Sequence, residues 1–141
     1  MKNDRLRVPI GALYLRSVGL AMICFARLEW DAVWCCERIQ SGYLQMVETK
    51  TAGQIANDLI GLAAAHPDPA IVTSLQPPAA DFNRLVGKRN DLVHANPGTV
   101  PNGEQRLFRK GSEWTTAMVD DLADEFVAAG LLLNHHLHHL L

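Results

Sequence analysis

The sequence predicts an all-α fold, an up-and-down bundle of four to five helices with a short β-ribbon between the last two. Three observations carry this prediction. Apolar residues recur at steps of three and four over most of the chain, which is the period of an amphipathic helix. The 141 residues are 48% hydrophobic and 20% charged, which fits one domain with a substantial core. Asn-Pro-Gly and Pro-Asn-Gly triplets gather between 96 and 103, where a ribbon with tight turns is expected.

One domain over residues 1–141 is predicted, with a polar leader at 1–8 and a His/Leu tail at 135–141. The net charge of −2 gives no general signal for nucleic acid, so any affinity for RNA must come from a local basic patch. Basic residues precede an apolar run near the N-terminus, but its longest uncharged piece, 17–26, is too short to span a membrane. A cytoplasmic protein without a membrane partner is therefore expected.

Three cysteines, Cys24, Cys35 and Cys36, all fall in a strongly helical stretch. Their spacing matches neither a CxxC motif nor a pair of metal ligands. Buried, reduced thiols are expected. Redox sensing by the adjacent pair is the alternative.

The first helix is predicted to start with Pro9 in its first turn and to stop at Ser41-Gly42. It carries two apolar seams, which implies burial on more than one side, inside a bundle or against a partner subunit. Trp30 and Trp34, four apart, widen that surface. The first seam is Ile10, Leu13, Ser17, Leu20, Cys24, Leu28, Ala32, Cys35 and Ile39; the second is Tyr14, Val18, Met22 and Phe25.

A second helix is expected from Ala52 to His66, capped by Thr49 or Thr51. The segment 67–78 carries four of the seven prolines and is predicted to be a linker. A third helix would begin near Pro78 and end at about 95, because Pro97 disfavours a helical residue before it.

The last part of the chain is predicted to hold a strand over 106–110, paired with 98–100, and a final helix capped by Ser112. His135 and His139 are spaced to share a face of that helix. No acid or cysteine completes a ligand set, so adventitious metal binding by a frayed tail is the interpretation, with neither a functional metal nor a cofactor expected. The expected core stripe is Met118, Leu122, Phe126, Ala129, Leu133 and Leu137, opposite an acidic face of Asp120, Asp121, Asp124 and Glu125.

The candidate site is the run from Arg89 to His94, where an arginine, a carboxamide, a carboxylate and an imidazole share two helical turns. Asn90 lies four residues before His94 and shares its face. Arg89, five before, reaches the imidazole only through its long side chain, or meets the histidine of a second copy across a two-fold axis. A guanidinium beside a titratable imidazole suits a phosphodiester, because the arginine can bind two phosphate oxygens while the histidine transfers a proton. A solvated helix end without chemistry is the alternative.

Supporting residues surround this run. Glu29, inside the apolar first helix, could orient Arg89 or His94, because a buried carboxylate needs a partner; it could equally be solvated. Asp91 would weaken RNA binding unless it points outward or pairs with Lys88. Between 84 and 110, six basic residues against two acidic ones leave +4, a patch suited to an RNA backbone. The basic residues are Arg84, Lys88, Arg89, Arg106, Arg109 and Lys110.

The run from Arg89 to His94 resembles the RxxxxH motif of the HEPN superfamily, with the polar Asn90 directly after the arginine. The order of elements is similar too, over about Pro9 to Asn134. The resemblance implies a helical bundle that dimerises and brings two motifs into one cleft. Many members are metal-independent endoribonucleases, often toxins of toxin–antitoxin or phage-defence systems. RNA, a second copy of the chain and an antitoxin protein are therefore the expected partners.

Carried over from the family, His94 would be the general acid or base, and Arg89 would hold the scissile phosphate and stabilise its developing charge. Asn90 would orient one of them, and cleavage would leave a 2′,3′-cyclic phosphate. Other members of the family bind only nucleotides, RNA or partner proteins. A non-catalytic dimeric module is thus the alternative function, and a helical bundle with a merely structural histidine is the third.

Overall fold

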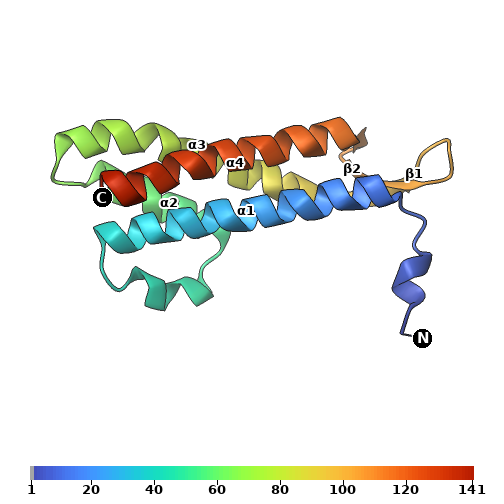
Figure 1. The fold of residues 1–141 in the computed structure, drawn as a ribbon, viewed down its shortest axis with the longest axis horizontal. Coiled ribbons are helices and arrows are strands. Elements are labelled where there is room, and N and C mark those ends of the chain that lie inside the picture. Colours follow the sequence, from blue (N-terminus) through green and yellow to red (C-terminus); the bar gives the residue numbers. More distant parts are fainter. Residues whose placement is uncertain (1) are drawn as a thin grey trace.

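The computed structural model describes residues 2–141, and this part of the chain is mainly helical (Figure 1). The predicted helical character, with a small β-ribbon between the last two long helices, is confirmed. The α-helices are α1 (Ala12–Ile39), α2 (Ala52–Ala64), α3 (Pro69–Val93) and α4 (Thr116–His139). Two 3-10 helices, η1 (Asp4–Arg7) and η2 (Tyr43–Thr49), complete the helical elements of the described residues. No helix within residues 2–141 combines the length and apolar character needed to cross a membrane.

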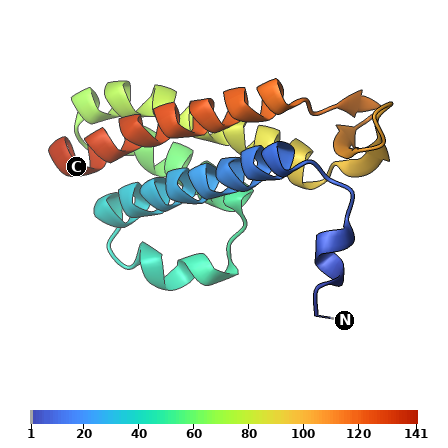
Figure 2. The same cartoon turned by 45° about the vertical axis from the view of Figure 1, so that its right-hand side comes forward.

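Helices α1 and α4 lie side by side along the long axis of the molecule and run in the same direction (Figures 1 and 2). Helix α3 runs antiparallel to α4, so that Ser74 lies beside His136 and Arg84 beside Glu125. The ribbon lies at the end of the molecule where α1 begins and α3 stops. The candidate run, at the end of α3, therefore lies next to the ribbon.

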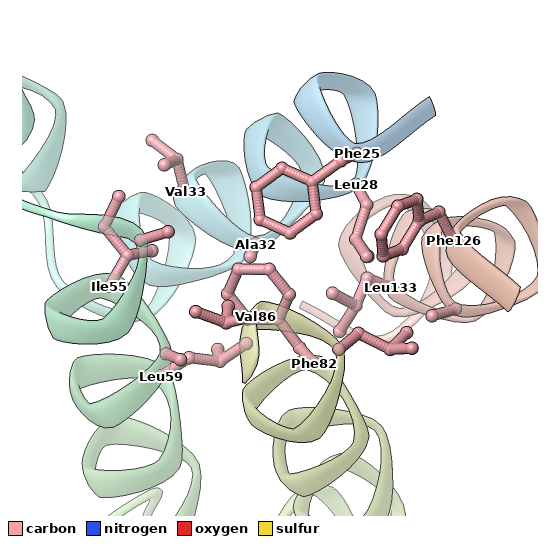
Figure 3. Close-up of a cluster of buried hydrophobic side chains, with 14 of the residues drawn as sticks. Phe25, Leu28, Ala32, Val33, Ile55, Leu59, Phe82, Val86, Phe126 and Leu133 are labelled. Atoms are coloured by element: carbon pink, nitrogen blue, oxygen red, sulfur yellow. The ribbon is translucent and has the colours of Figure 1, made fainter. Parts of the chain in front are cut away.

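Aromatic rings from three helices meet in the core (Figure 3). Phe25 of α1 stacks on Phe82 of α3 at 6.3 Å between ring centroids and meets Phe126 of α4 edge-on at 5.2 Å. Leu28 and Leu133 pack beside them, from α1 and α4. Burial of such large apolar side chains is the main favourable contribution to folding, at about 25 cal/mol per Å².

The buried face of α1 differs from the predicted first seam. Leu13 is 75% exposed and Leu20 is 52% exposed, whereas Leu28 from the same seam is buried. Trp30 and Trp34, expected in the core or in a dimer interface, are both exposed in the single chain and contact each other edge-on. The reason is that α1 packs mainly against α4 and to a smaller extent against α2, so its opposite face is left uncovered in the single chain. The buried face combines parts of both predicted seams with three residues outside them, and it consists of Tyr14, Ala21, Phe25, Leu28, Ala32, Val33, Cys35 and Cys36.

The prediction of a linker over 67–78 is wrong, because α3 begins at Pro69 and contains Pro77 and Pro78. Asp68 caps its start by accepting a hydrogen bond from the Ala70 N–H at 2.9 Å, and a proline in the first turn leaves no donor unsatisfied. The interior prolines lack N–H groups, so the carbonyls one turn earlier lose their helical partners. Tertiary packing compensates: Pro78 is buried, and Nε2 of His136 lies 3.1 Å from the Ser74 oxygen.

Helix boundaries elsewhere follow local hydrogen bonds. Thr51, not Thr49, caps α2 in a capping box with Gln54. Pro9 precedes α1 rather than starting it, because its carbonyl accepts a hydrogen bond from Gln105 in the ribbon. Thr115 caps α4 instead of the predicted Ser112, which belongs to the ribbon.

The ribbon has three antiparallel strands, β1 (Asn96–Thr99), β2 (Gln105–Arg109) and β3 (Ser112–Glu113). Lys110 and Gly111 form the second turn with positive φ angles of 52° and 80°. Tyr14 ties the ribbon to α1, since its hydroxyl donates to the Trp114 carbonyl and accepts from the Leu107 N–H, at 2.8 and 3.1 Å.

The C-terminal histidines do not form a frayed tail. Helix α4 continues to His139, and His136 is only 6% exposed. His135 and His139 share a helix face as predicted, with 4.8 Å between ring centroids. Within residues 2–141, no group of three or more His, Cys, Asp or Glu side chains is placed to hold a metal ion. Met118, predicted in the core stripe, is exposed because it lies on the outer face of α4, whereas its neighbour Val119 in the same turn is buried.

Candidate functional site

The end of α3 presents the candidate residues on a firmly packed base. Leu85, Val86 and Leu92 are buried and anchor the last turns of the helix. Asn-Pro-Gly follows at once as the start of β1, which stops the helix as predicted. The site therefore lies on a rigid element. Because the buried residues face the core, the polar side chains of the same turns point outward.

His94 is the residue at which α3 ends. Its backbone N–H donates to the Asn90 carbonyl at 3.0 Å, and its imidazole is exposed. Neither ring nitrogen makes a hydrogen bond to another described residue, so both stay available to a ligand. Asn90 is half-buried one turn earlier on the same face.

Arg89 is held in a different way from the other arginines of this region. Its Cζ lies 4.5 Å from the centroid of the Phe25 ring, a cation–π contact with α1. Its Nε is buried and makes no hydrogen bond. No carboxylate lies within ion-pair distance of this guanidinium among the described residues. Its terminal N–H groups are therefore free to donate hydrogen bonds, as bidentate binding of a phosphate requires.

Glu29 lies one helical turn after Phe25 on α1, on the same side of the helix. Burial raises the pKa of its carboxyl group, and the nearby charge of Arg89 opposes part of that rise. Glu29 and Arg89 thus interact through their charges across the α1–α3 contact. A direct ion pair between them is not formed.

Asp91 pairs with Arg109 of β2, with 3.5 Å between Oδ1 and Nε, rather than with Lys88. This pair fastens the ribbon to α3 and directs the carboxylate toward β2. Since Asp91 is engaged there, the negative charge expected beside the phosphate site is partly offset by Arg109.

Two further arginines of the predicted RNA-binding patch also have acidic partners. Arg84 donates to Asp81 and to Glu125 at 2.8 and 3.0 Å. Arg106 lies over the Tyr14 ring and donates to Glu104 at 3.2 Å. Because Asp91 and Glu104 are already counted in the +4, only the acidic partners of Arg84 lower this charge further. Lys88, Arg89 and Lys110 form no ion pair with the described residues, so the patch stays positive.

Lys88 and Lys110 are the members of the patch that remain exposed and form no ion pair with any residue of 2–141. Together with Arg89 they are the cations near the end of α3 that a ligand can reach without displacing a carboxylate. The structure brings Arg89 together with Phe25 and Glu29, whereas no hydrogen bond joins Arg89 to His94 within one chain.

Sequence reasoning placed Phe25 in an apolar seam and missed its contact with Arg89. The available signal was its spacing of four residues from Glu29, which puts both side chains on one face of α1. Comparison with protein-family models finds no match, and comparisons with curated proteins and with solved structures find none either. The site is therefore argued from its own residues.

Proposed function

We propose that this chain is a metal-independent endoribonuclease of the HEPN type, built on a HEPN-like helical bundle. The observation that carries the proposal is that the last two turns of α3 hold both an exposed imidazole without a hydrogen-bond partner among the described residues and an arginine whose donors are free. His94 ends α3 without a side-chain partner, and Arg89 is held by an aromatic ring instead of a carboxylate. A structural arginine in this region would be engaged as Arg84 and Arg106 are.

The chemistry follows from these two groups. Arg89 would bind two nonbridging oxygens of the scissile phosphate and stabilise the charge that develops on them. His94 would take the proton from the ribose 2′-hydroxyl, whose oxygen attacks the adjacent phosphorus, or deliver a proton to the 5′-oxygen that leaves. The P–O5′ bond breaks as the P–O2′ bond forms, which gives a 2′,3′-cyclic phosphate and a 5′-hydroxyl. Asn90, on the face of His94, would orient the imidazole or the phosphate.

A homodimer is part of the proposal, because one chain supplies only one arginine–histidine set and does not join its two members. Support comes from apolar side chains that the single chain leaves exposed on α1 and α4. A groove of about 400 Å³ between these helices is lined partly by Cys24, Trp30, Val127 and Leu131. Exposed apolar patches of this kind mark interaction surfaces.

The biological role proposed is that of a toxin or phage-defence effector acting on cytoplasmic RNA, with an antitoxin protein as its counterpart. A second candidate is a non-catalytic HEPN-like module that binds RNA, a nucleotide or a partner protein. The pairing of Arg84, Arg106 and Arg109 with carboxylates favours this candidate, because it leaves few cations for an RNA backbone.

Cleavage of RNA in the presence of EDTA distinguishes the two candidates. The wild-type chain is expected to produce 2′,3′-cyclic phosphate ends, and His94→Ala or Arg89→Ala should abolish the products while the helical circular dichroism stays unchanged. His138→Ala, which removes another exposed helical histidine, is the matched control and should retain activity. Growth arrest on expression, relieved by His94→Ala, would agree. Binding of RNA without products in any RNA tested would reject the nuclease and favour the module.

A further inference from the structure

We propose that Phe25 is a positioning residue for Arg89. Its ring contacts the face of the guanidinium and so fixes the plane of that group and the direction in which its N–H groups point. The inference rests on the proposed function and deepens it, since it names the group that aims the phosphate-binding arginine. It starts from the distance of 4.5 Å between the Arg89 Cζ and the ring centroid, within the 6 Å range of cation–π contacts.

The Phe25 ring is itself fixed. The residue is 5% exposed, and its ring is held by Phe82 and Phe126 at centroid distances of 6.3 and 5.2 Å, with interplanar angles of 22° and 68° (Figure 3). These rings come from α3 and α4, so the platform is built by three helices at once. Because the Phe25 ring is fixed in the core, it also restricts the position of the Arg89 side chain that contacts it.

No other contact among residues 2–141 fixes the guanidinium by a directional bond. The Arg89 side chain makes no hydrogen bond to these residues, and its buried Nε has no acceptor. The Glu29 carboxylate acts on it only at longer range. The ring is therefore the contact that decides where the terminal N–H groups point, and it does so without occupying them.

This arrangement suits a phosphate-binding arginine. A carboxylate would hold the guanidinium through the same N–H groups that a phosphate needs, as Asp81 and Glu125 hold Arg84. An aromatic face holds the cation from below and leaves its in-plane donors free. Removal of the ring should leave the arginine present but wrongly oriented.

The test compares Phe25→Leu with Phe126→Leu. Both remove one ring from the same buried cluster, but only Phe25 contacts Arg89. At a temperature where both variants are folded, Phe25→Leu is expected to lower kcat about 10- to 100-fold with a smaller change in KM, the scale of a misplaced catalytic group. Phe126→Leu should stay near wild type. Phe25→Met, which fills the space with a flexible side chain, replaces Phe25→Leu should that variant not fold.

A readout independent of cleavage separates this inference from the proposed function. The ring current of Phe25 should shift the Arg89 side-chain proton resonances upfield in NMR spectra, and the shift should vanish in Phe25→Leu but persist in Phe126→Leu. If wild type cleaves no RNA, the nuclease fails, and these resonances alone decide whether Phe25 positions Arg89. Equal losses of kcat in the two variants, or no ring-current shift in wild type, would overturn the inference.

Discussion

Replacement of His136 by leucine tests how α3 passes through two consecutive prolines. Pro78 has no N–H, so the Ser74 carbonyl lacks the donor that an α-helix normally supplies. Nε2 of His136 lies 3.1 Å from this oxygen, and Nδ1 lies 2.8 Å from the Leu132 oxygen. A neutral imidazole carries one N–H. Because the Leu132 carbonyl already has a helical donor in the backbone N–H of His136, we assign this hydrogen to Nε2, from which it can donate to Ser74.

The size of the effect follows from what the carbonyl loses. The contact is part-buried and Ser74 is exposed, so water can partly replace the lost donor, and leucine keeps the apolar contacts of the imidazole. His136→Leu should therefore lower the free energy of unfolding by about 0.5–1.5 kcal/mol, the net contribution of a typical hydrogen bond. For a chain of this size the midpoint of thermal unfolding falls by about 2–4 °C per kcal/mol. His138→Leu, at an exposed position of the same helix, should change it by less than about 0.5 kcal/mol.

A double-mutant cycle isolates the bond. Pro78→Ala restores an N–H that can donate to Ser74, so His136→Leu should cost about 1 kcal/mol less in that background than in wild type. Urea unfolding of the four variants, followed by circular dichroism, gives the coupling energy. A coupling near zero would refute the compensation of Pro78 by His136, whatever the cost of the single variants.

Three further predictions concern other parts of the chain. Burial raises the pKa of Cys35 and Cys36 to about 12, so both thiols should resist a disulfide reagent at pH 8 until urea unfolds the protein. Burial also raises the pKa of Glu29, so its ionisation opposes folding. Glu29→Gln should stabilise the fold at pH 7, and the gain over wild type, measured by urea unfolding, should shrink as the pH falls from the raised pKa to that of an ordinary glutamate. Gly98→Ala should lower the unfolding midpoint, because a Cβ there would lie 2.7 Å from an aromatic ring on the facing strand, whereas Gly61→Ala, in open space within a helix, should stabilise by about 0.5–1 kcal/mol.

Signals confined to a few neighbouring residues allowed much of the fold to be predicted. The capping box at Thr51 begins α2, and the Asn-Pro-Gly triplet ends α3, both within about two residues of the expected positions. The ribbon followed from the same triplets. Each of these features depends on hydrogen bonds or backbone restrictions within a single turn.

What the sequence did not reveal depends on contacts between distant segments. The donor that allows a helix through Pro78 comes from His136 on another helix. Which seam of α1 is buried depends on where the other helices pack, and so Leu13 and Leu20 were assigned to the core although both are exposed. At the site, spacing located Arg89 and His94 at the end of α3, but the Phe25 platform is formed across the α1–α3 contact.

Ion pairs formed in the folded chain also change the charge that an RNA would meet. Counted along the chain, Arg84 and Lys88 are equal members of a basic patch. In the structure Arg84 is held by Asp81 and Glu125, while Lys88 is exposed without an ion pair. Since only a cation that meets a phosphate releases a counterion, Lys88 but not Arg84 should contribute to the salt dependence of binding.

The measurement is RNA affinity against salt concentration, by fluorescence anisotropy with a single-stranded RNA. Each phosphate contact to a single strand contributes about −0.7 to the slope of log K against log salt, so Lys88→Gln should make the slope shallower by about that amount. Arg84→Gln combined with Glu125→Gln keeps the net charge and should leave the slope unchanged. A loss of slope in the charge-neutral pair equal to that in Lys88→Gln would mean that Arg84 leaves its carboxylates to bind RNA. The patch counted along the sequence would then be the surface that RNA meets, because binding would reorganise the ion pairs between α3 and α4.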